Sequence, residues 1–277
     1  MDLYSKTSFE VSRLVTNRYS TSFSMGIRLF ARKFREPVYA LYGFVRLADE
    51  IVDTFHGHDK KELIERFRAD TSDAIERKIA VNPILHSFQK TVNRYGIERE
   101  HIDAFFFSME LDLTEQTYGR ELFDRYVYGS AEVVGLMCLR IFCEDDDALY
   151  TRLKPHARAL GAAFQKVNFL RDIQSDLNER KRIYLPDVPD PMSLDEEEKR
   201  KFESEIEEDF RQALPGIKAL PASSRLGVYL AYVFYSSLFS KIRKKSINEL
   251  MARRVRLSNI RKMVMLIRSL VTVRFLR

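Results

Sequence analysis

Long helices are what this sequence predicts first, because few of its residues can interrupt a helix. The 277 residues include only 10 glycines and 8 prolines, the two residue types that most disfavour a helix interior. Phe202, Ile206, Phe210 and Leu214 recur every four positions, which is the spacing of one helical face. No segment alternates apolar and polar residues between hairpin turns. We therefore expect an all-α fold.

Local signals place two helix starts and one break. Asp59 with Glu62, and Ser193 with Glu196, are spaced as the first turns of capped helices. The segment YLPDVPDP, from Tyr184 to Pro191, contains three prolines and cannot continue a helix. Neither of its flanks has the composition of a separate domain. We expect this segment to be a loop at the edge of an active site rather than a linker.

The composition is that of a soluble globular protein, with 45% hydrophobic and 31% charged residues. Cys138 and Cys143 fit neither a CxxC redox pair nor a zinc half-site, so we expect buried, reduced thiols in a cytoplasmic protein. No signal peptide is visible at the N-terminus. The longest apolar stretch, LGVYLAYVFYSSLF, is too short and too rich in tyrosine and serine to span a bilayer. Residues 1–277 are predicted to form a single domain.

The positive charge is concentrated at the C-terminal end. From Lys241 to Arg277 there are twelve Lys or Arg and one acid, Glu249, a formal charge of +11 in a chain of +6. Such an excess suits nucleic acid, an anionic membrane surface or phosphorylated substrates, or it belongs to a solvated helix face. We expect reversible, peripheral association with the cytoplasmic face of an anionic membrane. The acidic run DEEEKRKFESEIEED, residues 195–209, is expected to be a solvated face without a function.

Two segments place polar residues on one stripe of an otherwise apolar helix. In YGFVRLADEIVD, the stripe is about 60° wide at 100° per residue, and it consists of Tyr42, Arg46, Asp49 and Asp53. In QKVNFLRDIQSD, the corresponding stripe consists of Gln165, Asn168, Asp172 and Asp176. Helices that are apolar on their other sides are expected to be buried, so each polar stripe needs a partner. Two such DxxxD elements together favour a functional site.

Carboxylates on adjacent helical turns repel each other, so burying them requires a cation. Their oxygens are hard ligands that suit Mg²⁺, or Mn²⁺, and Mg²⁺ usually bridges protein acids to substrate phosphates. His56 and His58 lie in an expected loop, and no cluster of His or Cys favours zinc. Two facing acidic helices are predicted to hold Mg²⁺ around a diphosphate and to stabilise the departing pyrophosphate. The basic residues that could bind the diphosphate oxygens are Arg46, Arg171 and the run Arg180-Lys181-Arg182.

Further segments accompany the two aspartate motifs. They are YSTSFSMGIRLF from Tyr19, YVYGSAEVVG from Tyr126, NFLRD with the later IYLP, and RRVRLSNIRK near the end. Together they resemble the squalene and phytoene synthase family of head-to-head prenyl transferases. YGFVRLADEIVD, SAEVVGLMCLRIF and FQKVNFLRDI are especially similar to bacterial phytoene synthases. The resemblance implies one all-α isoprenoid-synthase helical bundle around a central hydrophobic cavity.

The resemblance also implies roles for residues at matching positions. The metal-binding motifs of the family match Asp49, Asp53, Asn168, Asp172 and Asp176. The residues implied to be catalytic are the four aspartates of these motifs, Arg46 and Tyr128. The substrate-binding positions are Tyr19, Ser20, Thr21, Ser22, Tyr42, Arg46, Gln165, Asn168, Arg171, Tyr235 and Arg254. Tyr126 is expected to pack rather than to act, and most phenylalanines are expected to form ordinary core.

The implied reaction is that of a phytoene synthase, with Mg²⁺ and without NADPH. One geranylgeranyl diphosphate ionises, and the double bond of a second attacks the cation to give a cyclopropylcarbinyl diphosphate. A second ionisation then leads to phytoene. The nearest alternative is a squalene or dehydrosqualene synthase acting on farnesyl diphosphate. A helical protein that binds nucleic acid through its basic end is a further alternative, but it leaves both aspartate stripes without a purpose, so we expect no nucleic-acid partner.

Overall fold

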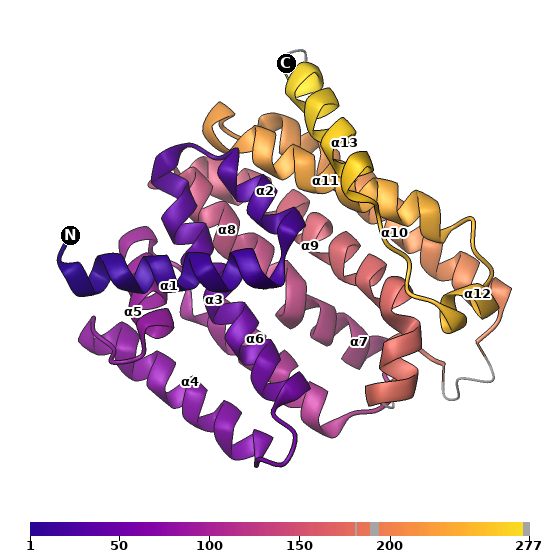
Figure 1. Ribbon diagram of the computed structural model, residues 1–277, viewed down its shortest axis with the longest axis horizontal. Helices are drawn as coiled ribbons and strands as arrows, with labels where there is room; N and C mark the ends of the chain where they lie inside the picture. The colour runs from indigo at the N-terminus through magenta and orange to yellow at the C-terminus, as the bar shows by residue number, and fades with distance from the viewer. Residues whose placement is uncertain (181, 189–193, 274–277) are drawn as a thin grey trace.

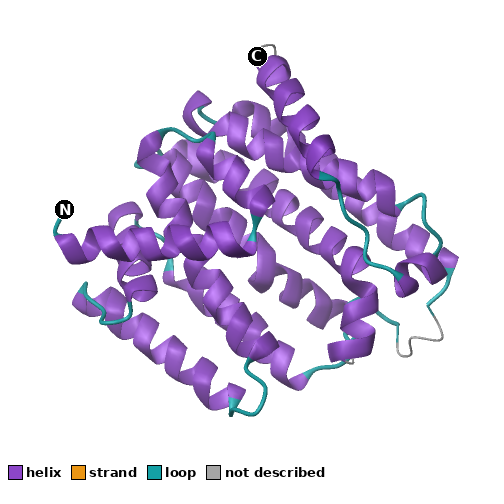
Figure 2. Ribbon diagram, viewed as in Figure 1, coloured by secondary structure: helices purple, strands orange, loops and turns teal. Residues whose placement is uncertain are grey.

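The described part of the chain is largely helical, as the recurrence of apolar residues every three to four positions predicts. The computed structural model describes residues 1–180, 182–188 and 194–273, with the side chains of residues 179 and 180 excepted. The elements are α1 (Leu3–Tyr19), α2 (Thr21–Arg28), α3 (Arg32–Thr54), α4 (Lys60–Arg77), α5 (Pro83–Tyr95), α6 (Arg99–Thr114), α7 (Arg120–Val127), the π-helical η1 (Tyr128–Glu132), α8 (Val133–Cys143), α9 (Asp147–Ser175), the π-helical η2 (Asp176–Arg180), α10 (Glu196–Ala219), α11 (Ala222–Ile242), α12 (Ile247–Ala252) and α13 (Asn259–Thr272). No strand occurs in the described ranges (Figure 2), where Thr117 and Ile183 form an isolated bridge. The all-α prediction is confirmed.

Side-chain caps fix where several helices begin. Asp59 accepts a hydrogen bond from the backbone N–H of Glu62 at 3.0 Å, which confirms the predicted start of α4. The predicted start at Ser193 lies outside the described residues. The cap that the structure shows for α10 is Asp195, which accepts from the N–H groups of the second and third helical residues. The predicted helix boundary is therefore corrected to Asp195.

The proline-rich segment is non-helical over residues 182–188, and its remainder to Pro191 lies outside the described residues. Asp187 adopts a positive φ of 60° and accepts a hydrogen bond from the backbone N–H of Arg120 at 3.0 Å. The Asp187 N–H donates in turn to the carbonyl of Tyr118. These contacts tie the loop to the connection between α6 and α7. Tyr184 of this loop lines the central cavity, as expected of a loop at the edge of an active site.

Two large clusters of buried apolar side chains hold most of the helices together, and a third, small cluster joins α13 to α11. The first joins α2–α6 and α8, and it includes Phe44 stacked on Phe88 with ring centroids 3.8 Å apart. The second draws mainly on α7 and α9–α12. Figure 1 shows the corresponding division of the molecule, with α1–α5 at the left and α9–α13 at the right. The central cavity takes its lining from both clusters.

The acidic run at the start of α10 differs in part from its prediction as a solvated face. Lys199 and Glu203 are both buried and form an ion pair of 2.6 Å. Lys166 of α9 contacts Glu205 at 3.1 Å and Asp209 at 2.9 Å. One side of α10 packs on α9, so the acids on that side are paired with lysines rather than solvated.

Among the residues that the structure describes, one helical run, Arg120–Cys143, is long and apolar enough to cross a membrane, but 56% of its most apolar stretch is buried inside the protein. It comprises α7, η1 and α8, which pack in the core, and core helices of this kind pass the same test of length and composition. Within this run, Cys138 is half-buried and Cys143 is buried, and neither forms a disulfide.

Candidate active site

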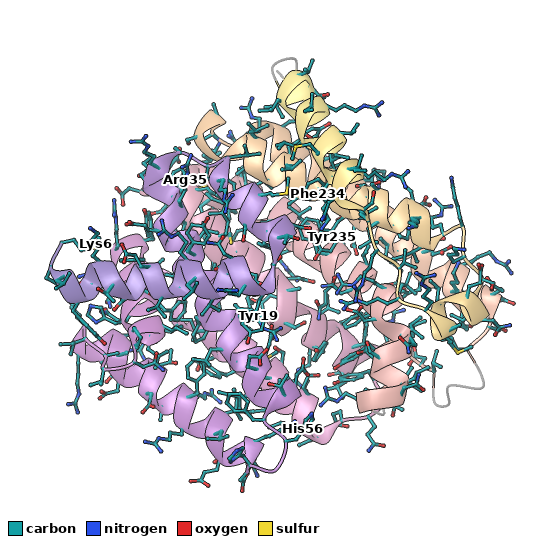
Figure 3. All side chains as sticks on the ribbon, in the orientation of Figure 1. Lys6, Tyr19, Arg35, His56, Phe234 and Tyr235 are labelled. Atoms are coloured by element: carbon teal, nitrogen blue, oxygen red, sulfur yellow. The ribbon has the colours of Figure 1, made fainter. Side chains whose placement is uncertain are left out.

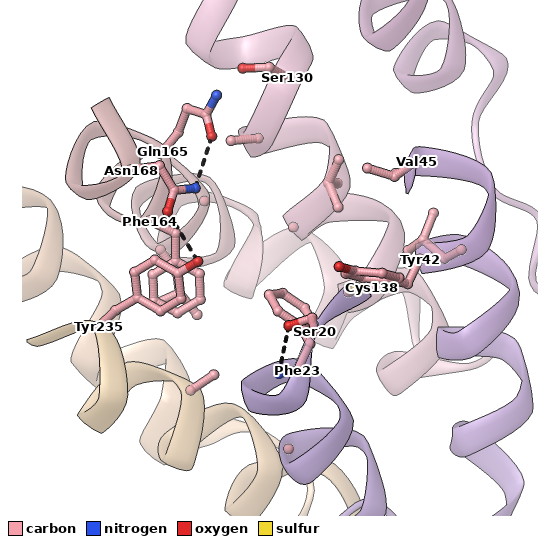
Figure 4. A pocket seen from close by; sticks show the side chains of 18 of the residues that line it. Ser20, Phe23, Tyr42, Val45, Ser130, Cys138, Phe164, Gln165, Asn168 and Tyr235 are labelled. Atoms are coloured by element: carbon pink, nitrogen blue, oxygen red, sulfur yellow. Dashed lines mark hydrogen bonds between the residues drawn. The ribbon is translucent and has the colours of Figure 1, made fainter. Parts of the chain in front are cut away.

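A cavity of about 760 Å³ lies between the two core clusters. Side chains of α2 and α3 face those of α9 and α11 across it (Figure 4). Charged and polar groups of the two aspartate stripes line one part. The remaining lining is largely apolar and includes Ile27, Phe30, Leu139, Phe142 and Leu153. A cavity with one charged region and one apolar region suits an amphiphilic ligand.

The first predicted stripe, on α3, reaches the cavity as a unit. All four of its members, Tyr42, Arg46, Asp49 and Asp53, line the wall. Arg46 forms an ion pair with Asp49 at 3.9 Å and another with Glu50. Its guanidinium also lies over the Tyr19 ring, 4.3 Å from the centroid. Burial, reinforced by the Asp49 charge, raises the pKa of Tyr42 to about 12, so this phenol stays protonated at neutral pH.

The second predicted stripe, on α9 and the first residue of η2, also lines the cavity. Its members are Gln165, Asn168, Asp172 and Asp176. Asp172 accepts from Arg171 Nε at 2.9 Å and lies 2.6 Å from Nε of Arg254, which is 82 residues away. Burial lowers the pKa of Arg171, but the contact with Asp172 outweighs burial and raises it above its usual range. The structure thus brings both stripes and two predicted arginines to one cavity.

Amide groups and an aromatic pair complete the α9 side (Figure 4). Tyr235 of α11 donates to Asn168 Oδ1 at 3.3 Å, and Asn168 Nδ2 donates to Gln165 Oε1 at 3.4 Å. The Tyr235 ring stacks on Phe164 with centroids 3.9 Å apart. These contacts fix the orientation of the Asn168 amide beside the aspartates. Tyr235, predicted to be a substrate-binding residue, therefore lines the cavity beside the second motif.

The predicted N-terminal segment reaches the cavity only in part. Tyr19 and Ser20 line it, whereas Thr21 and Ser22 are not among the lining residues. Ser20 caps α2 by accepting from the N–H of Phe23 at 3.2 Å. Because α2 begins directly after this cap, Thr21 turns outward and is exposed. The substrate contacts predicted for Thr21 and Ser22 find no support in their positions.

The tyrosine predicted to be catalytic, Tyr128, is not among the lining residues either. It begins the π-helical segment η1, and Arg158 lies over its ring at 5.2 Å from the centroid. The neighbouring Tyr126, expected to pack only, lines the cavity. A π-helical turn holds more residues than an α-helical turn, so it changes which residues of α7 and α8 share a face. Tyr126 rather than Tyr128 therefore lines the cavity, and the position of Tyr128 does not support the catalytic role predicted for it.

A buried network that the sequence did not reveal lies behind the α3 stripe. Asp112 of α6 accepts from the hydroxyl of Tyr126 at 2.9 Å and from that of Tyr184 at 2.7 Å. Arg182 Nη1 lies 3.4 Å from Asp112 and 4.0 Å from Asp53, so the network reaches the first aspartate motif. Burial raises the pKa of Asp112 to about 6 although Arg182 lowers it. The available signal was an acid, Asp112, between Leu111 and Leu113 in the largely apolar segment FFFSMELDL, because a buried acid needs partners.

Of the basic run Arg180-Lys181-Arg182, Arg182 is the residue that the structure places beside the first aspartate motif, through its contacts with Asp112 and Asp53. Lys181 lies outside the described residues, and nothing is described of the Arg180 side chain. His56 lies in the connection after α3, at the lower edge of the molecule in Figure 3, and does not line the cavity.

The donor set of the cavity fits Mg²⁺. The lining offers the carboxylates of Asp49, Asp53, Asp172 and Asp176 and the amide of Asn168. Within the described residues no three acidic, histidine or cysteine side chains are close enough to form a closed metal site. Mg²⁺ sites that use one or two carboxylates together with substrate phosphates need no such closed cluster. These five side chains are those that would hold the metal.

Comparisons with known proteins agree with this fold and identify the family. The squalene/phytoene synthase family profile matches residues 16–188. The phytoene synthase of Arthrospira platensis is 25% identical over 264 residues, covering 86% of this chain and 84% of its own length. The presqualene diphosphate synthase of Rhodopseudomonas palustris is 31% identical over 170 residues, covering 60% and 58%. A crystal structure of a dehydrosqualene synthase superimposes with a TM-score of 0.83 at 19% identity and covers 98% of both chains.

An all-helical enzyme with two facing aspartate motifs is thereby defined as a prenyl transferase. The chain belongs to the squalene/phytoene synthase family, as its sequence segments predicted. Its reaction class is the head-to-head condensation of prenyl diphosphates, and the family typically uses Mg²⁺.

Proposed function

We propose that this chain is a phytoene synthase that condenses two molecules of geranylgeranyl diphosphate. The observation that carries the proposal is the extent of the similarity. The match to the Arthrospira platensis phytoene synthase covers 86% of the chain, whereas the match to the presqualene diphosphate synthase covers 60%. The C-terminal part of the chain supplies two residues to the cavity, Tyr235 of α11 and Arg254 from the connection between α12 and α13.

The charged part of the cavity is the place for both diphosphates. Arg46, Arg171 and Arg254 carry positive charge there, and each already contacts an acid of the two motifs. Bidentate guanidinium groups suit diphosphate oxygens. The aspartates and Asn168 would hold Mg²⁺, which would supply further positive charge for the departing pyrophosphate.

The apolar part would hold the two prenyl tails and exclude water from the cations. Ionisation of the first substrate releases pyrophosphate and leaves an allylic cation. The double bond of the second substrate attacks this cation, and loss of a proton closes the cyclopropane ring. The second ionisation releases the other pyrophosphate, the ring rearranges, and a second proton is lost to give phytoene. Phe23, Phe164 and Tyr235 line the cavity, and their aromatic faces would stabilise the positive charge of the cations.

The product assay tests the proposal directly. The purified chain with Mg²⁺ is given labelled geranylgeranyl diphosphate or labelled farnesyl diphosphate, each with and without NADPH, and the extracted products are separated by chromatography. We expect a forty-carbon hydrocarbon from geranylgeranyl diphosphate and no effect of NADPH, because proton loss needs no reductant. A thirty-carbon hydrocarbon as the main product, or a strict need for NADPH, would assign the chain to the squalene or dehydrosqualene synthases.

A second candidate function follows from the higher identity to the presqualene diphosphate synthase, 31% over the shared 170 residues. An enzyme of this type would stop at the cyclopropylcarbinyl diphosphate. The same assay separates the two candidates, because that product keeps one diphosphate and stays in the aqueous phase until phosphatase treatment. A labelled diphosphate product that persists in the presence of NADPH would support this second function.

A further inference from the structure

The C-terminal helix α13 carries apolar side chains on a face that points away from the rest of the protein. The exposed residues of this outer face are Ile260, Met263, Val264, Ile267, Leu270 and Val271. At 100° per residue they lie within an arc of about 120°. They are six of the fourteen large apolar side chains exposed in the described part of the chain, yet α13 has only 14 residues. Of the other eight, four lie on the 17-residue α1 and four lie outside the helices.

The opposite face already attaches α13 to the protein. Met265 and Ser269 are buried, and Met265 packs with Leu230 and Phe234 of α11. Figure 1 shows α13 lying along α11 at the edge of the molecule. Surface helices normally bury one apolar stripe and expose polar residues on the other side. Because the inner face of α13 holds it in place, its apolar outer face has no role in this contact and indicates an external partner.

Positive charge borders the outer face. Arg261 and Arg268 lie together on one side of the apolar arc, and both are exposed. Neither forms an ion pair with a residue that the structure describes. Arg253 and Arg256, in the segment before α13, are exposed as well. An apolar stripe flanked by arginines is the pattern of a helix that lies in the interface of an anionic bilayer.

We propose that the outer face of α13 docks on the surface of an anionic lipid membrane. The position of α13 relates this docking to the reaction, because the helix lies close to the cavity. Lys262 of α13 donates to Thr21 at 3.3 Å, directly beside the cavity residue Ser20. Arg254, a few residues before α13, lines the same cavity. Docking through α13 would therefore hold the charged part of the cavity near the bilayer, where prenyl substrates and a hydrocarbon product dissolve. This inference holds for either product.

The test compares two double variants of the full chain by sedimentation with vesicles. Val264→Glu with Ile267→Glu places two charges on the outer face. Ile79→Glu with Val81→Glu places two charges on exposed apolar residues in the connection between α4 and α5, at the left of Figure 1 and away from α13. On vesicles of mixed phosphatidylcholine and phosphatidylglycerol, we expect the α13 variant to bind at least about tenfold more weakly than the wild type. The control variant should bind as the wild type does.

Two further measurements identify the partner. Arg261→Gln with Arg268→Gln should weaken binding to mixed vesicles severalfold and leave the weaker binding to pure phosphatidylcholine unchanged. All three variants should keep the wild-type melting curve and wild-type turnover of detergent-dispersed substrate, because the substituted side chains are exposed and outside the cavity. The proposal is overturned if the wild type does not bind mixed vesicles, or if both glutamate variants lose binding equally. It is also overturned if the wild type is a dimer that only the α13 variant dissociates while vesicle binding persists, because the face would then join two copies.

Discussion

The two aspartate helices present the same stripe to the cavity but are held in different ways. On α3, Arg46 of the same helix contacts Asp49, and the buried network of Asp112 reaches Asp53 through Arg182. On α9, Asp172 is held by its neighbour Arg171 and by Arg254, whose side chain is 43% exposed. The α3 half is therefore supported from the core, and the α9 half from a segment at the surface.

This difference distinguishes the carboxylates that face the cavity from the side chains that hold them in place. Both halves present carboxylates to one cavity, so removing a carboxylate from either half should harm the reaction to a similar degree. The supporting groups differ in burial, and a buried ionic contact responds to substitution far more than an exposed one. Substitutions behind α3 should therefore have larger consequences than the substitution of Arg254 beside α9.

The largest effect is expected for the aspartates themselves. Asp49→Asn and Asp172→Asn should each lower kcat by roughly 100-fold or more, because each removes a charge that helps to hold Mg²⁺. Steady-state turnover with saturating substrate measures this, and EDTA should abolish turnover of the wild type. Asp73→Asn, an exposed aspartate on α4, is the matched control and should keep the wild-type rate. Near-normal turnover of either motif variant would remove that residue from the metal site.

The next effect concerns stability and its pH dependence. The pKa of Asp112 is about 6 in the folded chain against 3.8 for an unperturbed carboxyl, so the folded state keeps this proton more tightly than the unfolded state. The contribution of Asp112 to stability should therefore fall as the pH rises from about 4 to about 6, by at most roughly 3 kcal/mol. Urea denaturation of the wild type and Asp112→Asn across this range measures the difference. If the two proteins respond to pH in parallel, Asp112 is already ionised at the lower pH.

A smaller effect distinguishes the two tyrosines near η1. Tyr126→Phe removes the hydrogen bond to Asp112 at the cavity wall, so we expect kcat/KM to fall roughly tenfold. Tyr128→Phe is the matched control, and it should react nearly as the wild type does because Tyr128 does not line the cavity. The reverse order of effects would restore the catalytic role that the sequence predicted for Tyr128.

The smallest effect is expected for the surface support of α9. Arg254→Gln should raise KM about fivefold with little change in kcat, because solvent screens this partly exposed contact and Arg171 still holds Asp172. Arg253→Gln, the exposed neighbour, should leave both constants unchanged. A loss of kcat as large as that of Asp172→Asn would place Arg254 in the chemistry itself.

The sequence by itself determined the helical class, both aspartate stripes and the family. These features depend on residues a few positions apart, and helical geometry fixes how such residues are placed relative to each other. Tyr42 to Asp53 and Gln165 to Asp176 could therefore be assigned to single faces before any packing was known. The family segments extended the same local information along most of the chain.

Only the tertiary structure decided which distant groups meet. Asp112 and Arg182 are 70 residues apart, and Asp172 and Arg254 are 82 residues apart, so no local period connects them. Which of Tyr126 and Tyr128 lines the cavity depends on a π-helical turn, which an α-helical period does not predict. The outer face of α13 was likewise invisible in sequence, because its apolar residues look like core until packing shows which of its two apolar sides is covered. Local geometry is encoded by spacing, whereas burial and long-range pairing exist only once the helices are packed.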